Sequence, residues 1–309
     1  ILMGTVFTTL SSFGLIFATH FITIFICRML AGIAASSWLA FTILYAAYYE
    51  ADESVQAVTN VNAFNSAGKL LAFILGLTTA TLWGYKIPLV CSFLTGIAAI
   101  FCAVQLKPIT LKREPFQFRH VLAVFSNPAV LCASFFAIIM QAFLQGTVFS
   151  FTSTVAKELG ASAFEIGLNT VLFTLVQILS AGFIGKKVLK WLKPYQAVTI
   201  GFLLMGLSCL FVAYGDHMMF LYAAQIIGGV SNLMANSVLM SLIIRFVPQE
   251  NQSTAMGLFQ ALYGIGMTIG PVMTGQIASV STYSMAYLVM GIMTLVTAAL
   301  APVMLRKMN

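Results

Sequence analysis

Residues 21–47 read FITIFICRMLAGIAASSWLAFTILYAA, and Arg28 is the one charged side chain among these 27 residues. An α-helix rises about 1.5 Å per residue, so about 20 apolar residues cross a hydrocarbon core about 30 Å thick. Lipid offers the backbone no hydrogen bonds, and a helix satisfies all of its own. The stretch is therefore predicted to be a membrane-spanning helix.

The same pattern recurs along the whole chain. Hydrophobic residues make up 60% of the sequence and charged residues only 7%, whereas soluble domains carry about a quarter charged residues. Ten apolar segments are predicted to be helices, at residues 2–19, 21–47, 59–83, 87–106, 129–155, 164–185, 197–214, 218–244, 254–280 and 283–305. The expected fold class is all-α, a polytopic membrane helical bundle, with no soluble domain.

The net charge of +7 is a signal of membrane topology. In a soluble protein it would suggest nucleic acid as a partner, but here the basic residues alternate by loop, with Lys86 and Lys157 alone on one side. The opposite set holds Lys107, Lys112, Arg113, Arg119, Lys186, Lys187, Lys190, Lys193, Arg245, Arg306 and Lys307. The positive-inside rule predicts that this set and the C-terminus are cytoplasmic. No nucleic-acid partner is expected.

Catalytic and metal-binding patterns are not found in the sequence. The five cysteines, Cys27, Cys91, Cys102, Cys132 and Cys209, all fall within apolar segments without Cys-x-x-Cys spacing, and are expected to be small core residues. The three histidines lie in loops on both sides of the predicted membrane. We therefore expect no enzyme activity, no metal and no cofactor.

A weak internal repeat divides the chain. A shift of about 198 positions places Asn62 on Gln260 and Gly68 on Gly266. When the fifth and sixth segments are shifted back by the same number of positions, their counterparts in the repeat fall before residue 1. The repeat therefore predicts that two helices are absent and that the chain is a fragment.

These features resemble the major facilitator superfamily, whose members have two six-helix halves related by a parallel repeat. Residues 28–32, Arg-Met-Leu-Ala-Gly, resemble the Arg-x-x-x-Gly motif of the family's fourth helix. Residues 159–162 with Ile166 and Gly167 resemble the link between its seventh and eighth helices. The resemblance implies ten of twelve helices: an N-terminal half at 1–106 equivalent to family helices 3 to 6, a cytoplasmic linker at 107–127, and a six-helix half at 128–309.

A glycine-rich stretch in the ninth segment resembles the Gly-Pro motif that antiporter members carry in their fifth helix. In this chain the stretch lies in the equivalent of the family's eleventh helix. In the equivalent of the fifth family helix, Phe73 occupies the position that corresponds to Pro271. The residues expected to bend the helix during alternating access are Gly266, Gly270, Pro271 and Gly275. Close helix packing is the alternative explanation, and the sequence does not separate the two.

The resemblance implies a central cavity lined by the first, fourth, seventh and tenth family helices. At helical spacing, Ser134, Gln141, Gln145 and Thr152 fall along one face of the fifth segment, and Gln225, Asn232 and Asn236 along one face of the eighth. We predict that Gln141, Gln145, Gln225, Asn232 and Asn236 line a substrate cavity. The alternative is that such amides join helices, at about 0.6 kcal/mol each.

Two basic residues lie inside the predicted helices, where charge is costly. Lys69 is near the middle of its segment and shares a polar face with Asn62 and Ser66, so all three are assigned to the substrate cavity. There Lys69 could titrate or pair with an anionic substrate, or it could pair structurally with a carboxylate. The family motif implies a coupling role for Arg28, and snorkelling of its guanidinium is the alternative.

The function predicted first is secondary active transport of a small organic solute, by proton-linked efflux. The alternatives are uptake or exchange of an anionic solute, with Arg28 and Lys69 as counter-charges, and a non-transporting membrane protein or inert truncated product. Expected partners are the lipid bilayer, a small-molecule substrate and protons, with the protein a monomer. The expected location is the bacterial inner membrane.

Overall fold

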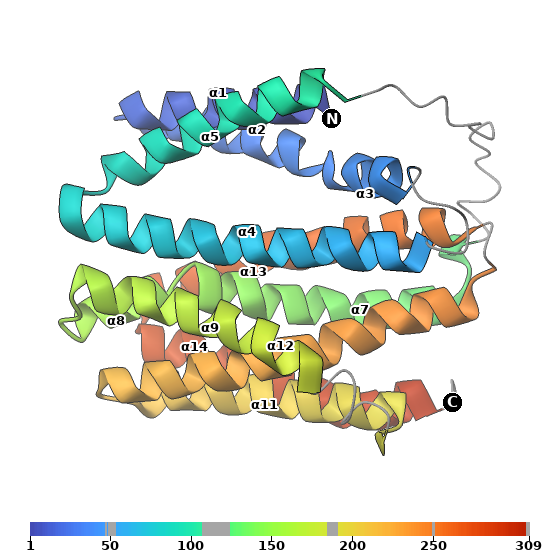
Figure 1. Ribbon diagram of the computed structural model, residues 1–309. Coiled ribbons are helices and arrows are strands. Elements are labelled where there is room, and N and C mark those ends of the chain that lie inside the picture. The colour runs from blue at the N-terminus through green and yellow to red at the C-terminus, as the bar shows by residue number, and fades with distance from the viewer. Residues whose placement is uncertain (47, 49–53, 107–123, 184–190, 249–250, 307–309) are drawn as a thin grey trace. The chain divides into compact units, whose positions relative to one another are not determined.

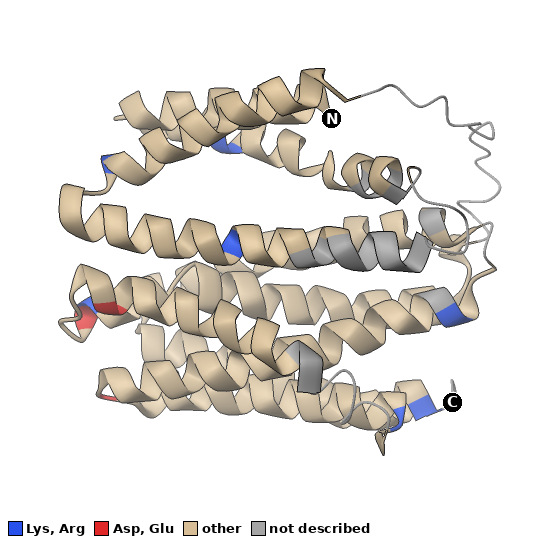
Figure 2. Cartoon of the chain, viewed as in Figure 1, with Lys and Arg blue, Asp and Glu red and all other residues tan. Residues whose placement is uncertain are grey.

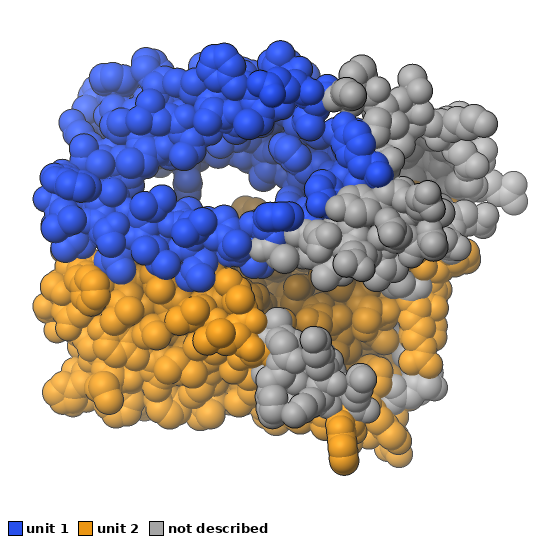
Figure 3. Space-filling view, viewed as in Figure 1, with its two compact units in different colours: residues 1–115 blue, residues 116–309 orange. Residues whose placement is uncertain are grey.

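A computed structural model describes residues 1–46, 48, 54–106, 124–183, 191–248 and 251–306. Every regular element within these ranges is a helix (Figure 1). The elements are α1 (Leu2–Phe17), α2 (Phe21–Ala35), α3 (Trp38–Ala46), α4 (Ser54–Trp83), α5 (Lys86–Val104), α7 (Pro128–Phe143), η2 (Leu144–Phe149), α8 (Thr152–Glu158), α9 (Ala163–Phe183), α11 (Pro194–Tyr214), α12 (Met218–Phe246), α13 (Gln252–Val280) and α14 (Tyr283–Leu305). The chain divides into two compact units, unit 1 (Ile1–Pro115) and unit 2 (Phe116–Asn309), shown in Figure 3.

The predicted all-helical membrane architecture is confirmed. Eight stretches of the described chain are long and apolar enough to cross a membrane, and two shorter apolar helices, α1 and α2, precede them. Together these match the ten predicted segments in order. The predicted division at 1–106, 107–127 and 128–309 stays a prediction, and most of its linker lies outside the described residues.

The second predicted segment, 21–47, is not one continuous helix. It is divided into α2 and α3 by a turn at Ser36 and Ser37. The Ser36 Oγ donates to the Ile33 carbonyl at 2.7 Å and the Ser37 Oγ to the Ala34 carbonyl at 2.6 Å. Serine hydroxyls can compete in this way with the backbone ladder.

Unit 1 is built on small polar contacts between its helices. α1 packs against α2 and α5, and α4 packs against α3 and α5. The hydroxyls of Ser12 and Ser92 are 2.8 Å apart across the α1–α5 contact, where Gly96 also faces Thr9. In the apolar stretch of α4 at 64–83 the one buried residue is Thr79, whereas two thirds of the residues in the apolar window at 128–158 are buried. The main hydrophobic core therefore lies in unit 2.

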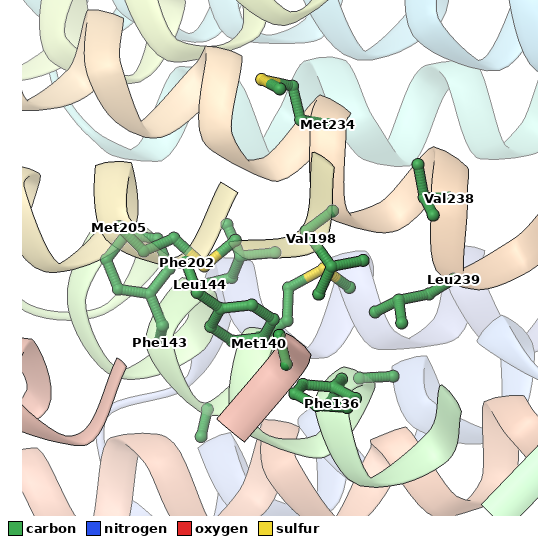
Figure 4. Packing of buried hydrophobic residues seen from close by; sticks show 14 of the residues in the cluster. Phe136, Met140, Phe143, Leu144, Val198, Phe202, Met205, Met234, Val238 and Leu239 are labelled. Carbon is green, nitrogen blue, oxygen red and sulfur yellow. The ribbon is translucent and has the colours of Figure 1, made fainter. Parts of the chain in front are cut away.

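The core of unit 2 joins α7, α11 and α12 through large apolar side chains (Figure 4). Phe136 and Met140 of α7 and Phe202 and Met205 of α11 are all fully buried. The rings of Phe136 and Phe202 lie 5.8 Å apart, centre to centre. Such contacts hold α7 and α11 at a fixed separation by dispersion and close packing.

The fifth predicted segment, 129–155, also differs from a regular helix. α7 begins at an N-cap, Asn127, whose side chain accepts from the Ala129 N–H at 2.9 Å, with Pro128 in the first turn. After Phe143 the chain passes into the π-helical turn η2, and a turn at Ser150 and Phe151 separates η2 from α8. A π-helical turn has more residues per turn than an α-helix, so the side-chain register changes at η2.

Candidate functional site

Small residues on α13 contact the backbone of α7 directly. A Cβ added to Gly266 would overlap the Ile138 carbonyl, and one added to Gly270 would overlap the Ala142 carbonyl. From the other side, a Cβ on Gly146 would come within 2.8 Å of the Gly270 carbonyl oxygen. Contacts spaced four residues apart on both helices form the small-residue interface that membrane helices use for close approach.

This interface accounts for two of the four residues predicted to bend α13. Gly266 and Gly270 are at positions where no larger residue fits, so close packing explains them. Gly275 is less confined, because an added Cβ would lie 3.2 Å from the Phe151 ring. α13 remains helical through Pro271, although proline supplies no N–H to the carbonyl four residues before it. Bending at these residues stays a prediction.

A buried polar cluster lies at the end of η2. The carbonyl of Thr147 accepts hydrogen bonds from the Thr152 Oγ1 at 2.9 Å and from the Tyr287 hydroxyl at 3.1 Å. The Thr152 and Tyr287 hydroxyl oxygens are themselves 3.0 Å apart. The Thr147 carbonyl also accepts from the Phe151 N–H at 3.3 Å, so at this break in the helix α8 and α14 supply further donors.

Gln225 of α12 joins this cluster. Its Nε2 donates to the Thr152 Oγ1 at 3.2 Å, and its side chain is only 3% exposed. The structure thus brings together two residues that the sequence placed on separate polar faces. The cluster also contains Tyr287 and Thr147, which the sequence did not single out. Gly146 followed by Thr147 inside an apolar run was the available signal, because glycine in a helix interior often marks a local irregularity.

The remaining polar residues of the two predicted faces differ in burial. Ser134 and Thr152 are buried, whereas Gln141 and Gln145 are half-buried, so the four do not share one environment. The predicted single face on the fifth segment is wrong, because η2 changes the register between Gln141 and Thr152. On α12, Asn232 is buried with Gln225, and Asn236 is half-buried. Whether these amides line a substrate cavity stays a prediction.

The two predicted basic residues both lie in unit 1. Arg28 of α2 and Lys69 of α4 are exposed, and Ser66 of α4 is half-buried, while the side chain of Asn62 lies outside the described residues. Across the part of the chain that the structure describes, the one ion pair joins His217 to its neighbour Asp216 at 3.7 Å. Neither basic residue is therefore paired there. Figure 2 shows that most other described charges are at helix ends.

The link between α8 and α9 is shaped by local backbone chemistry. Gly160 has a φ of +79°, which an L side chain rarely adopts. Ser162 caps α9 in a capping box, since its N–H and its Oγ both donate to the Glu165 Oε2 at 2.8 Å and its Oγ accepts from the Glu165 N–H at 3.3 Å. This is the stretch whose residues resemble the link between the seventh and eighth family helices.

The described fold and its broken, closely packed helices define a polytopic α-helical membrane protein. A profile of the Major Facilitator Superfamily matches residues 131–308. Because this match spans more than half of the sequence, the chain belongs to the Major Facilitator Superfamily, a family of transporters. The predicted resemblance is confirmed.

Similarity to individual proteins is more distant. An uncharacterised MFS-type transporter of Methanocaldococcus jannaschii is 22% identical over 227 residues, which are 70% of this chain and 58% of that protein. The quinolone resistance protein NorA of Staphylococcus aureus is 28% identical over 136 residues, or 44% of this chain and 35% of NorA. The chain thus spans well under two thirds of these relatives.

A solved structure has the same fold. The human organic anion transporter MFSD10 (TETRAN) superposes with a TM-score of 0.71 at 16% identity, covering 97% of this chain and 76% of that one. At this level of identity the likeness concerns the fold alone.

Proposed function

We propose that the chain is a secondary active transporter that exports a small organic solute in exchange for protons. The family match over residues 131–308 is the observation that carries transport as the function. Proton-linked efflux is the finer part of the proposal. It is supported by the similarity to NorA, a quinolone resistance protein.

The proposed substrate cavity is lined by amide side chains of unit 2. Gln141 of α7, Gln145 of η2 and Asn236 of α12 are half-buried, so part of each side chain stays open to a solute. Gln225 and Asn232 lie deeper in the same bundle and would act by holding α12 in place. Lys69, Ser66 and Asn62 of α4 belong to unit 1, and their assignment to a substrate cavity stays a prediction from the sequence.

The α7–α13 interface suggests which helices move together. Gly266 and Gly270 let the two backbones touch, and sliding one helix past the other would drive Cβ atoms into these contacts. α7 and α13 are therefore proposed to move as one body during alternating access. Pro271 and Gly275 lie beyond the tightest contact and are the proposed positions for bending.

A second candidate function is uptake or exchange of an anionic solute. It is favoured by one observation: Arg28 and Lys69 are basic, lie in apolar helices, and have no ion-pair partner among the described residues. Basic residues within a membrane are expensive unless a counter-charge or water stabilises them, and an anionic solute would supply that charge. The third candidate is a membrane protein without transport activity.

Uptake of a fluorescent quinolone into inverted membrane vesicles tests the first proposal. Vesicles carrying the protein should accumulate the dye faster than control vesicles when respiration acidifies their interior. A protonophore should abolish the difference. Uptake that is unchanged by the protonophore would contradict proton coupling. If the vesicles take up no quinolone, quinolones are excluded as the class of substrate.

Lys69→Met separates the two transport proposals, with Lys86→Met as a control at the helix end. If the solute is anionic, Lys69→Met should lower uptake of a carboxylate that the unaltered protein carries, and Lys86→Met should not. Undiminished carboxylate uptake by Lys69→Met would overturn the second candidate. If the folded protein transports none of the quinolones and carboxylates tested, the third candidate, a membrane protein without transport activity, is favoured.

Location and topology are also proposals. We propose that the chain is a monomer in a bacterial inner membrane. Its C-terminus is proposed to be cytoplasmic, because the positive-inside rule predicts that the segments rich in basic residues, including Arg245 and Arg306, are on the cytoplasmic side. A reporter fused after Asn309 that fluoresces only in the cytoplasm checks this orientation.

A further inference from the structure

A small cavity lies beside the end of η2, inside unit 2. Its polar lining comes from five helical elements: Thr147 of η2, Thr152 of α8, Ser208 of α11, Gln225 of α12 and Tyr287 of α14. Its volume is about 10 Å³, which is about the least space that holds one water molecule. The cavity thus has both polar and apolar walls and is of the size of one water molecule.

Gln225, one of the residues that line this cavity, has an unsatisfied atom. Its Oε1 is buried and has no hydrogen-bond partner among the described residues, although its Nε2 donates to Thr152. Turning the amide over would only leave Nε2 without an acceptor in its place. A buried amide keeps its full desolvation penalty until each of its polar atoms has a partner, so a group that donates a hydrogen bond to Oε1 is required.

The neighbouring hydroxyls determine what that group must do. The Ser208 Oγ donates its proton to the Met205 carbonyl at 2.7 Å, and the Thr147 Oγ1 donates to the Phe143 carbonyl at 2.6 Å. Both oxygens keep lone pairs and have no proton left to give. The occupant therefore has to donate hydrogen bonds. A metal cation is disfavoured, because no lining residue carries a negative charge to offset its desolvation.

We propose that this cavity binds one ordered water molecule, which donates a hydrogen bond to the Gln225 Oε1 and a second to the hydroxyl of Ser208 or Thr147. The water completes the polar cluster that holds the η2 break against α11, α12 and α14. Because a bridging water changes partners at small cost, it allows the broken helix to alter its hydrogen bonds without exposing an unpaired amide. The inference concerns the fold of unit 2 and is independent of the transported solute.

Radiolytic footprinting tests for this water. A millisecond X-ray pulse splits a bound water molecule where it lies, and the hydroxyl radical oxidises the nearest side chains. Cys209 lines the cavity and is 1% exposed, whereas Cys132 is 7% exposed and does not line it. In nanodiscs, Cys209 should be oxidised several-fold faster than Cys132. Equal or slower oxidation of Cys209 would mean that the cavity is dry and would overturn the proposal.

The variant Gln225→Leu tests whether the water binds through the Gln225 amide. Gln225→Leu removes the unsatisfied amide, so the excess oxidation of Cys209 should be lost while Cys132 reacts as before. Excess oxidation that persists in a folded Gln225→Leu protein would contradict binding through Gln225. If that variant does not fold, the comparison of Cys209 with Cys132 in the unaltered protein still decides whether the cavity holds water.

Discussion

Gly270 of α13 lies against the backbone of Ala142 in α7, so closely that a Cβ at position 270 would overlap the Ala142 carbonyl oxygen. This contact, with the matching one between Gly266 and Ile138, joins the first and fifth membrane-spanning segments of unit 2. The glycines that resemble an antiporter motif are therefore part of a helix interface. Their substitution should act on stability before it acts on any transport step.

Gly270→Ala is expected to destabilise the protein by about 1–3 kcal/mol, because the added methyl group forces α7 and α13 apart. Gly264→Ala is the matched control, since a Cβ there meets nothing within 4 Å. The check is the midpoint of thermal unfolding in detergent. Equal midpoints for the two variants would show that α7 and α13 are not in backbone contact at this position.

Tyr287→Phe should lower stability by about 0.5–1.5 kcal/mol, because the hydroxyl that donates to Thr147 and contacts Thr152 is lost from a buried site. Tyr283→Phe, also on α14, is the control, since its ring packs on Phe151 and its hydroxyl has no hydrogen-bond partner among the described residues. A double-mutant cycle of Tyr287→Phe with Thr152→Val should show coupling. Additive losses would indicate that the two hydroxyls do not interact.

Gly160→Ala should cost about 1–2 kcal/mol, because position 160 has a positive φ that a Cβ makes unfavourable. Gly257→Ala is the comparison, at a helical position of α13 where a Cβ meets nothing within 4 Å. There alanine should be neutral or stabilising, since it favours the helix more than glycine does. Thermal unfolding of both variants tests this, and a harmless Gly160→Ala would mean that the α8–α9 link adopts another conformation.

Gln145→Leu should slow quinolone uptake several-fold while leaving the unfolding midpoint close to that of the unaltered protein. The reason is that a half-buried amide in a solute cavity acts on the solute and not on the packing. Gln177→Leu, a half-buried residue of α9 outside the proposed cavity, serves as the control. If Gln145→Leu instead lowers the midpoint and uptake in parallel, the glutamine joins helices and is not part of the cavity.

Much of the fold could be predicted from the sequence. Long apolar runs such as 283–305 require no knowledge of their neighbours, because the membrane itself sets the length and the helical conformation. Residues 28–32 and the link at Gly160 indicated the family for a similar reason, since each is a pattern of neighbouring residues that can be recognised without knowledge of the tertiary structure. Family membership followed from such patterns and was confirmed by the match over residues 131–308.

The candidate site was less accessible to sequence reasoning. A constant helical period placed Gln141 and Thr152 on one face, but the π-helical turn between them shifts the register. The two serines between α2 and α3 give a weak signal, since serines such as Ser208 and Ser231 also lie within unbroken helices. Tyr287 gave no signal at all, because its role depends on a carbonyl 140 positions earlier in the chain.

The sequence by itself determined that the chain is a helical membrane protein of the Major Facilitator Superfamily, because composition and short motifs act locally along the chain. Only the tertiary structure decided that Gly266 and Gly270 lie against α7, and that Gln225, Thr152 and Tyr287 meet beside the break at η2. These contacts join segments far apart in sequence. They are set by how helices pack and by where a broken helix finds donors for its freed carbonyls.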